Sequence, residues 1–267
     1  MDLKYKSKTY IEQGLTNDNY LLVLEDNSKI VYRKPKKHNI KFDYNNEKNI
    51  IDLIKPLNIG PNELYFNPET GEKISSYIEN TKYFNNHNYH HLKEIAITLK
   101  KLHSLQVNIE FKMFDKLNEY KGNEKSIFLF EENIINSLIK YQSHDKQVLC
   151  HNDLVKGNLL FSDKFYLIDY EYASNNYLEF DLASLLSENN IESNKTIIYF
   201  LKEYYGHEIN EDLFKKVMTY YVFEDILWSY WALNFYKLYQ KPIYKKILKQ
   251  KYNRANKFYN LYIKKED

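Results

Sequence analysis

The stretch VLCHNDLVKGNLLFSDKFYLIDYEYA, residues 148–173, is the part of the chain that decides the fold. It contains two short apolar runs of the kind found in strands, and polar side chains follow each run. Asp153 and Asn158 come after the first run, and Asp169 ends the second. Phosphoryl transfer needs a hydroxyl aimed at phosphorus and neutralised phosphate oxygens. We therefore expect Asp153 to accept the hydroxyl proton, and Asn158 and Asp169 to offer oxygens to Mg²⁺.

This spacing has a second reading in which the same residues have no catalytic role. Asp153 and Asn158 would then cap turns, and Asp169 would start a helix. The pattern HxDxxxxN alone is only suggestive, because it is short. The two flanking strand-like runs, the second of which ends in an aspartate, favour the kinase reading.

Two segments of this stretch and its continuation resemble a known family. HNDLVKGNLL, residues 151–160, resembles the catalytic loop of the choline/ethanolamine kinase family, a branch of the aminoglycoside phosphotransferase superfamily. IDYEYASNNYLEFDLAS, residues 168–184, resembles the family segment IDFEYxxxNxxxFDLA. The resemblance implies an α+β, bilobal, protein-kinase-like fold with a small β-rich N-terminal lobe and a larger, mainly helical C-terminal lobe. It also implies a place near the metal for Glu171 and support of the catalytic loop for Asp181.

Composition is that of an enzyme with small partners. The 267 residues contain 38 lysines and arginines against 36 acidic residues, so no cationic excess suggests nucleic acid. The single cysteine excludes an intrachain disulfide. No apolar run is long enough for stable membrane insertion, and the first residues lack the apolar core of a signal peptide. We expect a cytoplasmic protein that acts on a small molecule; the oligomeric state is not indicated.

The pattern of apolar residues changes along the chain from strand-like to helical. Leu92, Ile95, Ala96, Leu99 and Leu102 begin the helical part, which continues outside the catalytic region. A polar stretch at residues 79–86 separates the two parts, so we predict a nucleotide-binding lobe at 1–80 and a catalytic and substrate-binding lobe at 81–267. The elements expected in the first lobe are strands at 19–24, 29–34 and 73–78 and a helix at 43–57.

The segment QGLTN, residues 13–17, lies between two strand-like pieces near the N-terminus. From spacing alone, a hairpin turn without a ligand is as good a reading as a loop that covers phosphates. The segment also resembles the GGxTN loop of bacterial choline kinases, with Gln13 in place of the first glycine. The resemblance implies phosphate contacts from Gly14, Thr16 and Asn17.

Further nucleotide contacts are implied by the same resemblance. Arg33 stands where the family carries a strand-borne cation that contacts phosphate, and Glu47 matches the helix acid that orients it. A guanidinium can bind a carboxylate or phosphate through two parallel hydrogen bonds. The alternative is a solvated surface pair of little energetic value. Residues 73–78 correspond to the family's hinge, where Tyr77 and Ile78 would contact adenine.

Both tryptophans of the chain lie in one segment with helical spacing. Trp228 and Trp231 are three residues apart and share a face with Phe235. Such a stripe is usually core packing, but aromatic faces also bind a quaternary ammonium. The family carries a WxxW pair that forms a wall of its choline pocket, and Glu188 matches an acid near that pocket.

The resulting hypothesis is ATP- and Mg²⁺-dependent phosphorylation of the choline hydroxyl to give phosphocholine. Ethanolamine is the nearest alternative substrate, although a primary ammonium would prefer carboxylates and carbonyls to an aromatic wall. Thiamine and aminoglycoside kinases share the fold and the loop. A catalytically silent pseudokinase that binds choline or nucleotide is the alternative from another class.

Overall fold

The computed structural model describes residues 4–11, 17–36 and 43–264, which divide into two compact units. The first comprises Met1–Leu102 and Val155–Ala173, and the second comprises His103–Leu154 and Ser174–Asp267. The chain returns to the first unit because residues 82–83 pair with a strand at 159–161. This division by compactness differs from the functional division at residue 80, which stays a prediction.

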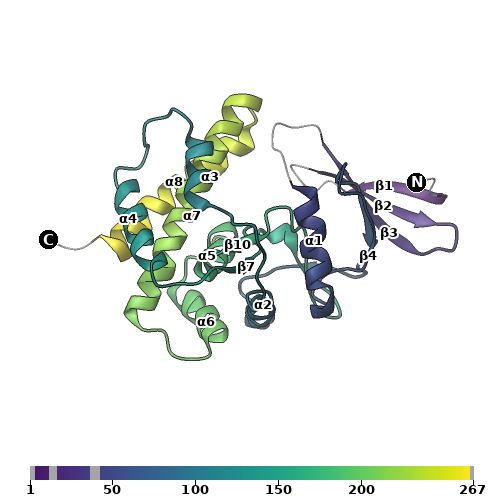
Figure 1. The fold of residues 1–267 in the computed structure, drawn as a ribbon, viewed down its shortest axis with the longest axis horizontal. Helices are drawn as coiled ribbons and strands as arrows, with labels where there is room; N and C mark the ends of the chain where they lie inside the picture. Colours follow the sequence, from purple (N-terminus) through teal and green to yellow (C-terminus); the bar gives the residue numbers. More distant parts are fainter. Residues whose placement is uncertain (1–3, 12–16, 37–42, 265–267) are drawn as a thin grey trace. The chain divides into compact units, whose positions relative to one another are not determined.

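The first unit contains an antiparallel sheet with one helix beside it (Figure 1). The strand order is β1-β2-β3-β5-β4, and the helix is α1. The bounds are β1 (Tyr5–Ile11), β2 (Asn17–Leu24), β3 (Lys29–Pro35), β4 (Glu63–Phe66), β5 (Lys73–Ser76) and α1 (Tyr44–Ile54). The three predicted strands and the predicted helix are therefore confirmed, except that β5 ends at Ser76, two residues before the predicted end. The edge strands β1 and β4 were not predicted, because β1 is mostly exposed and polar and β4 has only four residues.

Alternation along the central strands gives the sheet two different faces. Leu22, Ile30 and Ile74 pack together on one face. Arg33 and Lys73 are direct partners in the β3–β5 register. Each is separated by an odd number of residues from the cluster member of its own strand, so both lie on the other face of the sheet. Arg33, which is predicted to contact the nucleotide, and its partner Lys73 therefore project from the face opposite the apolar cluster.

Local signals fix the bounds of α1. The Asp43 side chain accepts a hydrogen bond from the backbone of Asn46 at 3.0 Å, which caps the N-terminus. The regular helix ends at Ile54, three residues before the predicted end, and continues as the 3₁₀ turn η1 (Lys55–Leu57). Pro56 lies in that turn and cannot donate to an α-helical ladder.

A second, three-stranded sheet in the first unit carries the segment that decides the fold. Its order is β6-β8-β9, and all its pairs are antiparallel. The strands are β6 (Lys82–Tyr83), β8 (Leu159–Phe161) and β9 (Phe165–Leu167), with helix α2 (Tyr89–Leu102) and the turn η2 (Lys156–Asn158). His91 of α2 stacks on Phe161 with ring centroids 3.7 Å apart, so α2 packs on this sheet.

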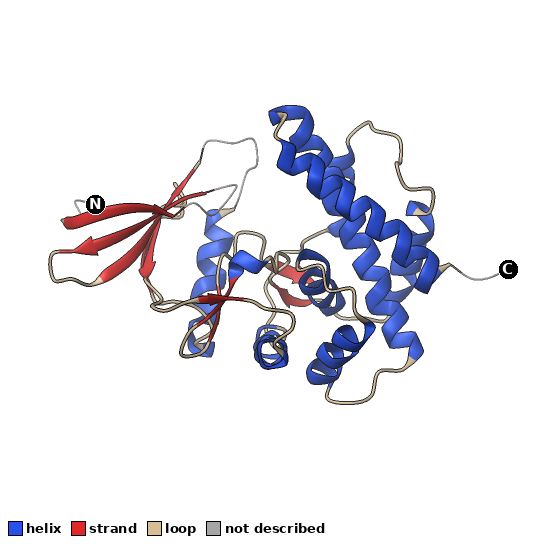
Figure 2. Cartoon of the chain, turned by 180° about the vertical axis from the view of Figure 1, so that it is seen from behind, coloured by secondary structure: helices blue, strands red, loops and turns tan. Residues whose placement is uncertain are grey.

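The second unit is mainly helical, as the periodicity predicted (Figure 2). It also contains a short antiparallel pair, β7 (Val148–Cys150) with β10 (Ser174–Asn176), and the catalytic-loop residues directly follow β7. The helices are α3 (Met113–Lys121), α4 (Glu131–Gln142), α5 (Leu178–Glu188), α6 (Asn194–Tyr205), α7 (Glu211–Tyr239) and α8 (Pro242–Phe258), followed by η3 (Tyr259–Ile263).

Helix α7 forms the centre of the second unit. All of its residues from Val217 to Ala232 are buried, as expected for a helix that is covered on all sides. Helices α3, α4, α5 and α8 all pack against it. Within the described ranges, no helix combines the length and apolar character that crossing a bilayer requires.

Candidate active site

The loop that carries Asp153 is held by a buried carboxylate in the second unit. Asp181, which is fully buried in α5, accepts hydrogen bonds from the backbone N–H groups of His151 and Asn152, each at 2.7 Å. His103 Nε2 lies 3.1 Å from the same carboxylate, and its Nδ1 lies 2.6 Å from the Tyr204 hydroxyl. Asp181 thus supports the loop, as the family resemblance implied.

The loop is also fixed on the other side of Asp153. The backbone N–H of Leu154 donates to Ser184 Oγ at 3.2 Å, and its carbonyl accepts from Asn189 Nδ2 at 2.8 Å. Asn152 has a left-handed backbone with a φ of 63°, and Asn176 Nδ2 donates to its side-chain oxygen at 2.9 Å. Asp153 itself is partly exposed. The neighbours of Asp153 are therefore anchored, while Asp153 itself is not fully buried.

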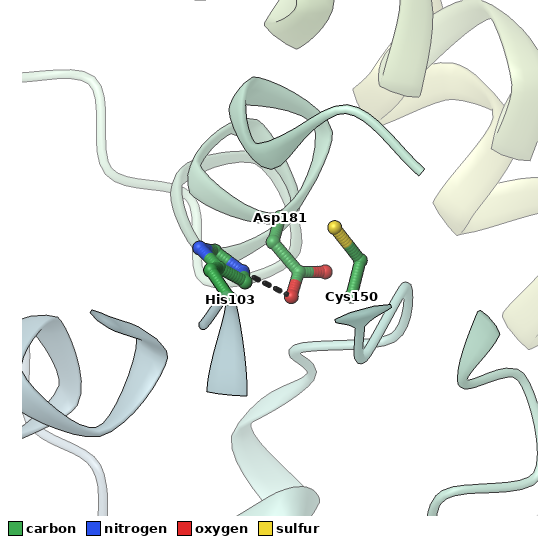
Figure 3. A group of neighbouring side chains, drawn as sticks. All are labelled: His103, Cys150 and Asp181. Atoms are coloured by element: carbon green, nitrogen blue, oxygen red, sulfur yellow. Dashed lines mark hydrogen bonds and ion pairs between the residues drawn. The ribbon is translucent and has the colours of Figure 1, made fainter. Parts of the chain in front are cut away.

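His103, Cys150 and Asp181 form a compact group of possible metal ligands (Figure 3). Their ligand atoms all lie within 4.8 Å of one another, and all three residues are buried. However, burial raises the pKa of the Cys150 thiol well above its ordinary value, with Asp181 adding to the effect. A metal prefers the thiolate, and both Asp181 oxygens already serve the loop. We interpret the group as loop support.

Asn158 and Asp169 are brought together within the first unit. Leu159 and Leu167 are direct partners in the β8–β9 pair, so the residues at its open end face each other. There the backbone N–H of Ile168 donates to the Asn158 carbonyl at 3.1 Å. Asp169 follows with a left-handed φ of 69°. Amide and carboxylate oxygens are the ligand types that suit Mg²⁺, so the residue types fit a metal. The role of Asn158 and Asp169 as metal ligands stays a prediction.

Arg33 and Glu47 form the predicted ion pair. Both are buried, with exposed fractions of 4% and 1%, and two parallel hydrogen bonds of 2.7 Å join the guanidinium to the carboxylate. Arg33 also donates to the Gly71 carbonyl at 3.0 Å, and one of its nitrogens lies 3.5 Å from Asp169. The solvated-pair alternative is therefore wrong. The pair is buried, and a phosphate contact would require Arg33 to exchange one of these acceptors.

Lys73 completes this charged group and was not predicted as a contributor. Its ammonium lies 2.8 Å from the Glu47 carboxylate, so Glu47 is shared between two cations. The signal that could have found Lys73 is the pairing of its strand with the strand of Arg33, which places both on one face. Gly71 has a φ of 74°, and a Cβ there would lie 2.4 Å from the Tyr44 ring, so glycine is required.

Acid should weaken the first unit through Glu47. Burial opposes ionisation, but Lys73 and Arg33 together lower the pKa of Glu47 below 4.5. A carboxylate with a lowered folded-state pKa stabilises above its unfolded-state pKa, and this contribution is lost as the pH falls. We expect the urea concentration at the unfolding midpoint to decrease as the pH is lowered from about 6 to about 3.5. The decrease should be smaller in Glu47→Gln. The exposed Glu69→Gln should keep the wild-type slope, and equal slopes in all three proteins would contradict the prediction.

The remaining nucleotide contacts are only partly described. Asn17 is buried, and its Nδ2 donates to Glu171 Oε2 at 3.0 Å, which links the predicted phosphate loop to the segment after Asp169. Gly14 and Thr16 lie outside the described residues. The role of Glu171 near a metal stays a prediction.

The predicted hinge residues line a cavity in the first unit. Tyr77 and Ile78 border a space of about 370 Å³ together with residues from 58–62 and from the turn between β8 and β9. The lining is dominated by amides, hydroxyls and charged groups, including Lys164 and Asp163. An adenine ring needs apolar walls, so this cavity does not identify the adenine site. The contacts of Tyr77 and Ile78 with adenine stay predictions.

Trp228 and Trp231 belong to an aromatic cluster in the second unit. Their ring centroids are 6.0 Å apart at an interplanar angle of 80°, and Trp231 stacks on Phe235 at 4.5 Å. Tyr120 lies 6.0 Å from Trp228, and Tyr244 lies 5.6 Å from Trp231. The tryptophans keep exposed fractions of 7% and 9%. Core packing therefore accounts for much of the stripe, and contact of the two tryptophans with a substrate stays a prediction.

Glu188, the predicted acid of the substrate site, already has a cationic partner. Lys251 of α8 lies 2.6 Å from its carboxylate and 3.0 Å from Ser187 Oγ. Lys251 is itself buried, with an exposed fraction of 6%. Nothing in the local sequence around Glu188 indicated this partner, because Lys251 is 63 residues away. Substrate contact by Glu188 stays a prediction.

Comparison with known proteins places the chain in a family. The model of the family described as choline/ethanolamine kinase matches residues 9–259. The chain belongs to this family. The choline/ethanolamine kinases transfer phosphate from a nucleotide. The chain is accordingly a kinase that binds a nucleotide.

Individual members of the choline/ethanolamine kinases resemble the chain to different extents. Protein LicA of Haemophilus influenzae is 25% identical over 242 residues, which cover 82% of this chain and 89% of that protein. The crystal structure of choline kinase LicA from Streptococcus pneumoniae has a TM-score of 0.81 and 25% identity, covering 97% and 95% of the two chains. An ethanolamine kinase of Saccharomyces cerevisiae is 31% identical over 123 residues, or 33% of this chain and 23% of that protein. The predicted α+β, protein-kinase-like fold is confirmed.

Proposed function

We propose that this member of the choline/ethanolamine kinase family transfers the terminal phosphate of ATP to the hydroxyl of choline, giving phosphocholine. The aromatic cluster around Trp228 and Trp231 carries the choice of substrate. A quaternary ammonium has no N–H to donate, so ring faces suit it better than hydrogen-bond acceptors do. Glu188, the acid that could attract a primary ammonium, is paired with Lys251 instead. A cytoplasmic location remains part of the proposal.

The residues of the anchored loop and of the β8–β9 segment have separate roles in this reaction. Asp153 orients the choline hydroxyl and accepts its proton, since its neighbours on both sides are fixed by hydrogen bonds. Asn158 and Asp169 would hold Mg²⁺, which neutralises charge on the phosphate oxygens when bound. Arg33 contacts a phosphate oxygen after exchanging one of its protein acceptors, and Glu47 keeps the guanidinium in place.

The closest competing proposal is phosphorylation of ethanolamine. Its primary ammonium carries three N–H donors and needs oxygen acceptors in the site. The family includes ethanolamine kinases, so membership does not separate the two substrates. The pairing of Glu188 with Lys251 favours choline because it removes a carboxylate from the set of acceptors.

Substrate competition tests the proposal directly. ADP release should be measured with choline, ethanolamine, thiamine and an aminoglycoside, each in the presence of ATP and Mg²⁺. We expect choline to give the highest kcat/KM, at least about tenfold above ethanolamine, because the aromatic wall distinguishes the two substrates by about 1–2 kcal/mol. A higher value for ethanolamine would replace choline as the substrate. ATP binding without ADP release from any of the four would identify a pseudokinase.

A further inference from the structure

A group of charged side chains, all buried except the partly buried Glu188, connects α5, α7 and α8 in the second unit. Its members are Glu188, Glu224, Asp225, Lys251 and Arg254. Lys251 pairs with Glu188 at 2.6 Å, and Arg254 pairs with Asp225 at 2.5 Å. This charged group therefore contains three carboxyl groups and two cations. Buried charges are stable only when they are compensated, so a third anion would need one more positive charge.

Glu224 is the carboxyl group that the two cations leave uncompensated. It is fully buried, and one of its oxygens accepts the indole N–H of Trp228. Its other oxygen, Oε1, is buried and has no hydrogen-bond partner among the residues that the structure describes. Glu188 and Asp225, by contrast, each accept from a cation at 2.6 Å or less. Glu224 therefore links an incomplete set of charges to the aromatic cluster.

The surroundings of Glu224 oppose its ionisation. Burial raises its pKa well above 4.5, and Glu188 and Asp225 raise it further. Lys251 and the Trp228 hydrogen bond act in the opposite direction but do not reverse the shift. With Glu224 protonated, two anions face two cations and the charged group is balanced.

We propose that Glu224 recognises the positive charge of the substrate through Trp228. The inference rests on the proposed function, in which the ammonium group lies against the Trp228 ring. A cation at this ring supplies the missing positive charge, so Glu224 loses its proton to solvent. The resulting carboxylate accepts the indole N–H more strongly and makes the ring face more negative, which favours the cation.

Glu224 acts on the ligand through the indole, because its side chain is fully buried and cannot touch a molecule at the ring. It thereby takes the role that the family resemblance suggested for Glu188. Lys251 neutralises Glu188 from within the protein, whereas no lysine or arginine among the described residues forms an ion pair with Glu224. The distinction predicts that binding of a cation, but not of a neutral molecule of the same shape, is coupled to proton release.

Calorimetric titration can measure this coupling in the 267-residue chain. Choline is titrated near neutral pH in two buffers with different ionisation enthalpies, which gives the number of protons released. We expect the wild type to release a substantial fraction of one proton. Glu224→Gln should release none and bind choline about tenfold more weakly, since it loses a charge but keeps an acceptor for Trp228. The neutral analogue 3,3-dimethylbutan-1-ol should bind both proteins equally, without proton release.

Controls separate this role from packing and from the proposed function. Glu224→Gln resembles the protonated acid, so its midpoint of urea unfolding should match that of the wild type. The control Glu192→Gln, at an exposed glutamate, should also have the wild-type midpoint. Equal proton release in wild type and Glu224→Gln would overturn the inference, and so would an equal loss of affinity for the charged and neutral ligands. If either of these two results is obtained and the wild type still phosphorylates choline, only the role of Glu224 is wrong. If the wild type neither binds nor phosphorylates choline, the proposed function fails, and this inference fails with it.

Discussion

Replacement of Asp153 by alanine should lower kcat for choline phosphorylation about a thousandfold, the range expected when a general base is removed. The carboxylate sits between two anchored neighbours, Asn152 and Leu154, so the backbone of the loop should survive the substitution. ATP binding should be unchanged, because Asp153 is assigned to the hydroxyl and not to the nucleotide. Rates of ADP release and an independent nucleotide titration measure the two effects separately.

Two further variants make this result specific to the Asp153 carboxylate. Asp153→Asn keeps the size of the side chain but not its basicity, and it should be nearly as slow as Asp153→Ala. Asp115→Ala removes an exposed aspartate from α3 of the same unit and should retain wild-type activity. Normal turnover in Asp153→Ala would remove Asp153 from the mechanism. A loss of ATP affinity equal to the loss of kcat would indicate a general disruption of the site.

Replacement of Asp181 by asparagine should cost about 3 kcal/mol of unfolding free energy. Its two oxygens accept the backbone N–H groups of His151 and Asn152, both fully buried. An amide keeps only one acceptor oxygen and turns an N–H₂ group toward the other donor, so at least one buried donor loses its partner. Urea unfolding monitored by tryptophan fluorescence measures the loss, with Asp115→Ala as the control for removal of a carboxylate.

The same substitution should also slow catalysis. We expect kcat to fall about a hundredfold even where Asp181→Asn is fully folded, because the loop that carries Asp153 would no longer be held in place. KM for choline should change much less than kcat, since Asp181 touches no substrate. An Asp181→Asn protein with wild-type stability would show that the two hydrogen bonds are not important for the fold. Wild-type kcat in a destabilised protein would show that support of the loop is unnecessary for turnover.

The sequence predicted those parts of the fold and site that depend on local spacing. Strands β2, β3 and β5 and the helical second unit followed from apolar periodicity, because alternation and helical spacing are properties of neighbouring residues. The loop with Asp153 and the pair Asn158 and Asp169 were found in the same way, from side chains that follow two strand-like runs. The family resemblance added the Arg33–Glu47 pair and the support of the loop by Asp181.

Contacts between distant parts of the chain were decided by the tertiary structure alone. Lys251 reaches Glu188 across 63 residues, and Asn17 reaches Glu171 across 154. Helix α8 determines which side chains lie against α5 and α7. Its contacts therefore decide whether Glu188 is available to a substrate and whether Glu224 lacks a cation. A sequence states which charges exist, but burial and distance decide which of them are neutralised, because electrostatic energies depend on position within the folded protein.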